Sequence, residues 1–240
     1  MQHLGQSRCS LQGDHSLITP DTFVRAPLPG MRNATAIVHA APATGAGFTE
    51  YTAEFEAGGT LGPVDGERFV FVLEGELTIK AHKLPANGYA FLPEDYPHEV
   101  KALTAAKAIV IEKQYIPLKG TKPPKAVFGN ERDLTPQPML GDEAVHIRSM
   151  IPEGFSYDLA VNTMTFQPGA TLPMVEVHVM EHGLFVLDGG GIYRLSSNWY
   201  PVQAGDFIWM APYCPQWFGA LGKTPARYVI YKDWNRHPLG

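Results

Sequence analysis

Four side chains with metal-binding donors stand at short spacings in the C-terminal half of the sequence. Glu176 and His178 are two residues apart, and His182 follows four residues later. Gln216 lies further along the chain. Side chains at i and i+2 of a β-strand point to the same face, so Glu176 and His178 can both face the interior of a barrel. Two imidazole nitrogens and two oxygen donors suit a borderline-to-hard divalent ion, and we therefore predict a metal site.

The donor types also rank the candidate metals. The set contains no thiolate, and Glu and Gln supply oxygens, so we expect Mn²⁺, with Fe²⁺ next and Zn²⁺ third. Four protein ligands on an ion that takes six leave positions at which a substrate can chelate it. The alternative is that two histidines four residues apart are incidental surface residues, because this spacing also arises by chance.

The elements that position these residues belong to an internal duplication, and such a repeat defines the domain that is copied. Four blocks of the first half recur in the same order in the second half: 55–61 in 166–172, 69–75 in 183–189, 87–98 in 204–216 and 108–115 in 227–234. One matched block alone is a weak signal. Four blocks in one order indicate two copies of a single domain.

Each copy consists of short β-rich runs separated by Gly, Pro, Asn and Asp, and no long stretch carries an apolar stripe of helical period. Short strands spaced by turns predict an all-β fold of two small barrels or double-sheet jelly rolls. The Pro- and Lys-rich stretch 116–138 reads as the connection between the copies. We place the boundary near Pro124, which gives domains 1–124 and 125–240.

The two copies differ where the metal donors lie. In the first copy Arg68 takes the place of His182, and residues 62–64, Gly-Pro-Val, stand where the first two donors are expected. His98 is the nearest counterpart of Gln216, and we expect it to be a hydrogen-bonded residue at the barrel mouth. We therefore predict one metal per chain, in the C-terminal copy, and a structural role for the N-terminal copy.

Composition bounds the remaining classes of function. The formal net charge of -5 offers no basic footprint for nucleic acid, and no apolar run approaches the ~20 residues of a membrane span. We expect neither nucleic acid nor membrane as a partner. Cys9 and Cys214 lie far apart, which predicts no disulfide framework and favours a reducing cytoplasm.

At these residues the chain resembles the cupins, whose first motif carries H-x-H followed by Glu and whose second motif ends on His. Here Glu176 and His178 fill H-x-H, His182 fills the Glu position, and Gln216 replaces the final His. This permuted set resembles the bicupin family of (S)-ureidoglycine aminohydrolases. The resemblance covers most of the chain, including the blocks 176–183, 191–212, 215–217 and 227–236. It implies two tandem cupin domains, each a double-stranded β-helix or jelly roll.

The resemblance further implies a manganese-dependent homo-oligomer that releases ammonia from (S)-ureidoglycine, a ureido amino acid of allantoin and purine catabolism. It places Tyr193, Tyr228 and Lys232 around the substrate, together with the ligands Glu176 and Gln216. Lys232 and Tyr193 are the expected catalytic residues. Lys232 is expected to neutralise the substrate carboxylate or to transfer a proton, and both tyrosines to orient the ureido group. Other cupins are Fe²⁺ dioxygenases or sugar isomerases, and a non-catalytic binding protein is a further alternative.

Overall fold

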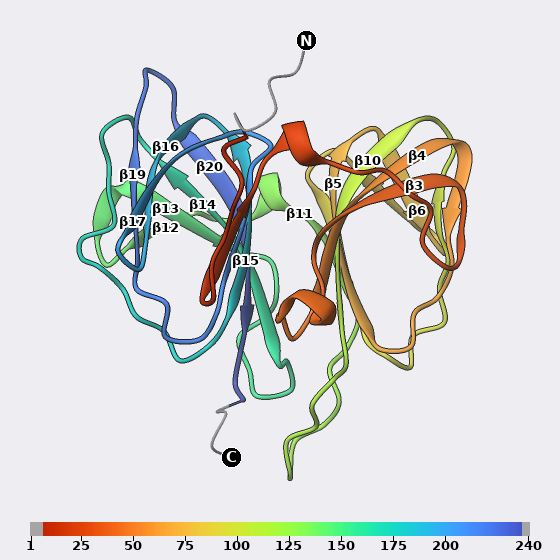
Figure 1. Ribbon diagram of the computed structural model, residues 1–240. Coiled ribbons are helices and arrows are strands. Elements are labelled where there is room, and N and C mark those ends of the chain that lie inside the picture. Colours follow the sequence, from red (N-terminus) through yellow and green to blue (C-terminus); the bar gives the residue numbers. More distant parts are fainter. Residues whose placement is uncertain (1–6, 237–240) are drawn as a thin grey trace. The chain divides into compact units, whose positions relative to one another are not determined.

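The computed structural model describes residues 7–236, which form short β-strands connected by turns (Figure 1). The helical elements within this range are three single 3₁₀ turns, at Pro20–Thr22, Pro42–Thr44 and Glu131–Asp133. The prediction of an all-β fold is confirmed. No helix among the described residues is long and apolar enough to cross a membrane.

The chain folds into two compact units, and each is assembled from separate stretches of sequence. The N-terminal unit comprises residues 24–134 and 150–158, and the described part of the C-terminal unit comprises residues 7–23, 135–149 and 159–236. The predicted division after residue 124 is therefore not the division found in the structure.

The N-terminal unit pairs its strands in the order β11-β8-β5-β10-β4-β9-β6-β7, with β3 on the other edge of β4. Its strands are β3 (Met31–Ala40), β4 (Thr49–Leu61), β5 (Glu67–Glu74), β6 (Glu76–Ile79), β7 (His82–Pro85), β8 (Gly88–Leu92), β9 (Val100–Ala102), β10 (Ala106–Lys113) and β11 (Val127–Asn130). β4 pairs with β10 over its first half and with β9 at its end, so this strand joins the two sides of a barrel. The side chains that point inward, among them Tyr51, Val70 and Val110, form one apolar core.

The C-terminal unit contains a large sheet, ordered β1-β2-β18-β15-β20-β14-β13-β12, and a small sheet, ordered β17-β16-β19. Its strands are β1 (Ser10–Leu11), β2 (His15–Ile18), β12 (Gln137–Met139), β13 (Asp142–Ser149), β14 (Leu159–Phe166), β15 (His182–Asp188), β16 (Gly190–Leu195), β17 (Asn198–Gln203), β18 (Phe207–Met210), β19 (Gln216–Ala220) and β20 (Ala226–Asp233). The core includes aromatic residues of both sheets, and the rings of Phe166 and Phe218 meet edge to face at 4.9 Å between centroids. The candidate ligands thus lie on a small double-sheet barrel.

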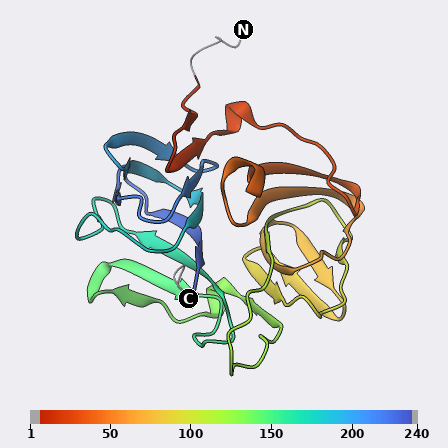
Figure 2. The same cartoon turned by 60° about the horizontal axis from the view of Figure 1, so that its bottom comes forward.

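Two strand edges explain why the units do not follow the sequence repeat. β11 lies beyond the predicted boundary at Pro124, yet it pairs with β8 through Val127 opposite Phe91. β2 pairs with β18 through Leu17 opposite Ile208, and the hairpin β1–β2 lies beside the strands of the C-terminal unit in both views (Figure 2). An exposed strand edge presents unpaired N–H and C=O groups, and a further strand satisfies them.

The repeated Glu-Gly and Asp-Gly dipeptides of the two copies mark equivalent turns. Gly75 follows β5 with φ of 77°, and Gly189 follows β15 with φ of 67°. A Cβ atom at Gly75 would lie 2.5 Å from the carbonyl oxygen of Ala105, and one at Gly189 would lie 2.6 Å from that of Pro225. Both the left-handed backbone and the close approach therefore require glycine.

Candidate metal and substrate site

The backbone holds Glu176 and Gln216 side by side. The Glu176 N–H donates to the Gln216 carbonyl at 2.8 Å, and the Gln216 N–H donates to the Glu176 carbonyl at 2.9 Å. Residues paired in this way across antiparallel segments place their side chains on the same face. The two predicted oxygen ligands therefore share one face at the start of β19.

His178 lies on the segment that carries Glu176, and its Nε2 is 3.2 Å from the Glu176 Oε2. The Tyr213 N–H donates to the His178 carbonyl at 2.7 Å, which ties this segment to the loop leading into Gln216. The ring centroids of His178 and His182 are 5.1 Å apart. The fold thus brings the predicted ligands to one place although Gln216 is distant in sequence.

His182 is the first residue of β15 and is 2% exposed. Its Nδ1 donates to the Glu181 carbonyl at 2.7 Å, so in the neutral ring Nε2 carries the lone pair. Nε2 is buried without a hydrogen-bond partner among the described residues. Burial, and then the charges of Lys232 and His178, lower the pKa of His182 to about 3. A neutral imidazole with a buried, unused lone pair fits a divalent metal.

Tyr193 reaches the site through a ligand. Its hydroxyl donates to the Gln216 Oε1 at 3.0 Å, and both side chains are buried. Burial, with the nearby Glu176 carboxylate, raises the pKa of Tyr193, so the phenol stays protonated and remains a donor. A hydrogen bond to Oε1 fixes the amide orientation of Gln216 and thereby the direction of its oxygen.

Lys232 and Tyr228 lie on β20, four residues apart and on the same face. Lys232 is directly opposite His182 in the pairing of β20 with β15. Burial lowers the pKa of Lys232 while the Glu176 carboxylate opposes the shift, so this lysine loses its proton more readily than an exposed one. The Tyr228 hydroxyl donates to the Met164 sulfur at 3.3 Å, deeper in the barrel core.

The equivalent place in the N-terminal unit holds a buried cation. Arg68 Nε donates to the Glu112 Oε1 at 2.7 Å, and Arg68 Nη1 donates to the Gly62 carbonyl at 2.7 Å and to the His98 Nε2 at 2.8 Å. The Tyr51 hydroxyl also donates to Glu112, at 2.9 Å. His98 donates from Nδ1 to the Tyr96 carbonyl at 2.6 Å, as expected for a hydrogen-bonded residue at the barrel mouth.

Strand alternation counted from His182 predicts that the neighbouring Glu181 points into solvent, and this prediction is wrong. Glu181 is only 9% exposed, and its carboxylate accepts a hydrogen bond from the Trp209 Nε1 at 3.1 Å. The alternation argument fails because β15 begins only at His182, so Glu181 does not follow strand periodicity.

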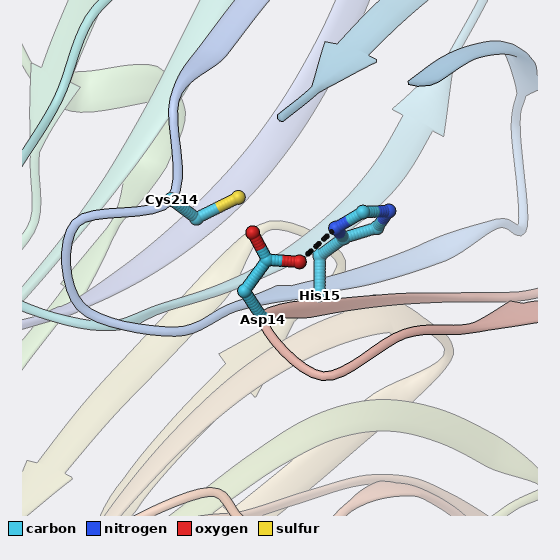
Figure 3. Close-up of side chains that lie close together, drawn as sticks. All are labelled: Asp14, His15 and Cys214. Atoms are coloured by element: carbon cyan, nitrogen blue, oxygen red, sulfur yellow. Dashed lines mark hydrogen bonds and ion pairs between the residues drawn. The ribbon is translucent and has the colours of Figure 1, made fainter. Parts of the chain in front are cut away.

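A second group of metal-type donors was missed by sequence reasoning. Among the described residues, one donor atom each of Asp14, His15 and Cys214 lies within 4.8 Å of the others (Figure 3). Both imidazole nitrogens of His15 are already engaged, Nδ1 with Asp14 at 2.7 Å and Nε2 with the Tyr200 hydroxyl at 2.9 Å. We therefore interpret the group as a hydrogen-bonded junction. No local spacing signals it, because Asp14 and Cys214 lie at opposite ends of the sequence.

Comparisons with known proteins agree with the fold and identify the family. The Cupin domain family model matches residues 162–231, which include β14 to β20 in large part. (S)-Ureidoglycine aminohydrolase of Arabidopsis thaliana is 42% identical over 98% of this chain and 80% of its own length. The Escherichia coli (strain K12) protein of that name is 32% identical over 93% of this chain and 90% of its own length.

Among solved structures, a putative glyoxylate-induced protein of Pseudomonas aeruginosa is similar along nearly its whole length. Its TM-score is 0.89 at 32% identity, and the match covers 99% of this chain and 94% of that one. The predicted cupin fold and the predicted family resemblance are thus confirmed. The chain belongs to the (S)-ureidoglycine aminohydrolase family of cupin proteins.

Proposed function

We propose that this chain hydrolyses (S)-ureidoglycine to (S)-ureidoglycolate and ammonia, in allantoin and purine catabolism, at a site built by the C-terminal unit. Near full-length identity to (S)-ureidoglycine aminohydrolases supports the reaction. The observation that carries the site is the His182 Nε2, a buried lone pair without a hydrogen-bond partner among the described residues, close to His178 and Lys232.

Glu176, His178, His182 and Gln216 would hold one divalent ion, and Mn²⁺ is our first choice for a set of two imidazoles and two oxygens, ahead of Fe²⁺ and Zn²⁺. The metal would supply charge stabilisation and a template that fixes which face of the substrate carbon is presented. The remaining chemistry belongs to side chains of the chain.

In the reaction, the water oxygen forms a bond to the substrate carbon and the water gives up one proton. The bond from that carbon to the amine nitrogen breaks, and this nitrogen takes up one proton and leaves as ammonia. We assign the proton transfer to the Lys232 Nζ, because Lys232 lies directly opposite His182 and burial lowers its pKa below that of an exposed lysine. In its charged form the same group can neutralise the substrate carboxylate. Tyr228 is part of the barrel core, and Tyr193 orients the amide of Gln216 through its hydrogen bond.

The decisive experiment measures ammonia release and product stereochemistry with freshly generated (S)-ureidoglycine. The substrate also loses ammonia spontaneously to give racemic product, so enzymatic turnover is recognised by an excess of one enantiomer. We expect rapid, Mn²⁺-stimulated formation of (S)-ureidoglycolate by the homo-oligomer expected in the cytoplasm. Racemic product at the background rate with Mn²⁺-loaded protein would exclude the proposed reaction.

A further inference from the structure

The stretch 211–216 leads from β18 into β19, contains one of the four proposed ligands and contacts two others. It ends on Gln216, which is paired with Glu176 through the backbone. Its Tyr213 N–H holds the His178 carbonyl. Tyr213 has φ of 65°, a left-handed conformation that costs a non-glycine residue about 1 kcal/mol or more. Such a conformation persists only where the surrounding contacts hold it.

The N-terminal hairpin also contacts this loop, at Asp14. The Ala211 N–H donates to the Asp14 carbonyl at 2.9 Å, at the first residue of the loop. The Ser196 hydroxyl donates to the Asp14 Oδ2, and the Ser196 N–H donates to the Pro215 carbonyl at 2.7 Å, at the residue before Gln216. Asp14 thus reaches the two ends of the loop, one directly and the other through Ser196.

The rest of the junction orients the Asp14 carboxylate. Its Oδ1 is hydrogen-bonded to the His15 Nδ1 at 2.7 Å, and the His15 Nε2 is hydrogen-bonded to the Tyr200 hydroxyl at 2.9 Å. Figure 3 shows the carboxylate between the His15 ring, on the hairpin, and Cys214, on the loop. His15 is buried, with 1% of its surface exposed, whereas the Asp14 side chain is 45% exposed.

We propose that Asp14 is a positioning residue of the metal site, which holds loop 211–216 so that Gln216 and His178 stay in ligand geometry. The inference rests on the proposed function, because it takes Gln216 and His178 as ligands. The N-terminal hairpin, which belongs to neither sequence repeat, is then a functional part of the C-terminal unit.

The test compares Asp14→Ala, Asp14→Asn and a matched control, Arg8→Ala. Arg8 lies on the same N-terminal segment and forms an ion pair with the fully buried Asp206 at 2.6 Å, and its hydrogen bonds among the described residues go to Pro201 and Asp206 and not to the loop. Mn²⁺ affinity is measured by electron paramagnetic resonance, stability by thermal unfolding of the metal-free protein, and loop opening by hydrogen exchange of residues 211–216.

We expect Asp14→Ala to raise the Mn²⁺ dissociation constant about 10- to 100-fold, as for other residues that orient ligands, and to speed exchange in the loop. Asp14→Asn keeps one acceptor for Ser196 and should recover part of the affinity. Arg8→Ala should lower the unfolding temperature with little effect on Mn²⁺ affinity or on hydrogen exchange in the loop. Equal losses of affinity in Arg8→Ala and Asp14→Ala would overturn the proposal, and so would wild-type affinity and exchange in Asp14→Ala.

Two further outcomes are separable. Wild-type protein that fails to bind Mn²⁺ would contradict the proposed function, and loop exchange alone would then decide whether Asp14 holds the loop. If Asp14, His15 and Cys214 themselves bound the ion, Cys214→Ala would lower Mn²⁺ affinity as much as Asp14→Ala. That result would overturn the positioning role in favour of direct ligation.

Discussion

Arg68 and Glu112 face each other across β5 and β10 at the register that His182 and Lys232 occupy across β15 and β20. Sequence blocks alone align Lys113 with Lys232, one residue away from this register. The structure instead places an acidic residue opposite an arginine in one unit and a lysine opposite a histidine in the other. The guanidinium thus occupies a place equivalent to that of a proposed metal ligand, which supports a structural role for the N-terminal unit.

Replacing Arg68 by Met should destabilise the protein by about 3 kcal/mol, because the change leaves the Glu112 carboxylate without its buried partner. Arg68 is 2% exposed and Glu112 is 17% exposed, so water compensates only in part. Urea unfolding measures the loss. Arg25→Met is the control, since the Arg25–Glu54 pair is 53% and 26% exposed and solvent screening should leave its loss with little effect on stability.

The double variant Arg68→Met with Glu112→Gln removes both charges and should recover most of the stability lost in Arg68→Met. Bound Mn²⁺ should stay at one ion per chain in all of these variants. If Arg68→Met proved as harmless as Arg25→Met, the ion pair would not be the element that stabilises the barrel interior.

The sequence predicts the strands well because their signals are local. The alternating or short apolar runs 75–81, 89–93 and 107–113 coincide largely with β6, β8 and β10, and the repeat correctly predicts two barrels. The sequence does not predict which segments of the chain make up each unit. The pairing of β11 with β8 and of β2 with β18 depends on which strand edges remain unpaired after the rest of each barrel has folded.

The candidate site likewise has a part that the sequence predicts and a part that it does not. The spacing from Glu176 to His182 is local, and the structure brings these side chains near Gln216. The hydrogen bond from Tyr193 to Gln216 and the contact of Ser196 with Asp14 join residues that no spacing rule relates. They follow from packing, which a single sequence does not display.

His178→Ala combined with His182→Ala should abolish stoichiometric Mn²⁺ binding, because two of the four proposed ligands are lost. Metal content is measured by elemental analysis after dialysis against a weak chelator, with wild-type protein expected to retain one ion per chain. His98→Ala in the N-terminal unit is the control and should retain the wild-type metal content. Retention of the ion by the double variant would refute the ligand assignment.

Tyr193→Phe removes the hydroxyl that donates to Gln216 and should weaken Mn²⁺ binding about tenfold, the lower end for residues that orient metal ligands. At saturating Mn²⁺, kcat should recover to near the wild-type value. Tyr228→Phe is the matched control, since its hydroxyl donates to Met164 and not to a ligand. A loss of kcat in Tyr193→Phe that saturating Mn²⁺ does not restore would instead assign Tyr193 a direct catalytic role.

Lys232→Met should lower kcat at least ~10²-fold with Mn²⁺ content unchanged, because it removes the proposed proton-transfer group and keeps much of the bulk. Lys232→Arg separates the two roles of the lysine. An arginine restores the charge but does not release a proton, so activity should stay low if proton transfer matters. The exposed Lys223→Met is the control, and near-wild-type kcat in Lys232→Met would exclude Lys232 from catalysis.

Glu50 provides a prediction about stability. This side chain on β4 is 1% exposed, and its Oε2 has no hydrogen-bond partner among the described residues. Burial raises the pKa of Glu50 to about 8. Nearby, burial lowers the pKa of His39 to about 3, and this group shifts stability with pH in the opposite sense. The contribution of the Glu50 carboxyl group is therefore isolated only by the difference in the free energy of unfolding between wild type and a Glu50 variant.

Between the ordinary pKa of glutamate and about 8, folding of the wild type takes up a proton at Glu50, so its contribution to stability is present at low pH and is lost as pH rises. The limiting slope is about 1.4 kcal/mol per pH unit, and the total should reach a few kcal/mol. Glu50→Gln cannot titrate, so the free energy of unfolding of wild type relative to this variant should fall from pH 5 to pH 8 and level off above. Urea unfolding across that range measures this difference.

Glu56→Gln, on an exposed position of the same strand, is the control and should keep the wild-type dependence of stability on pH. A constant difference between wild type and Glu50→Gln would show that Glu50 is already ionised in the folded protein.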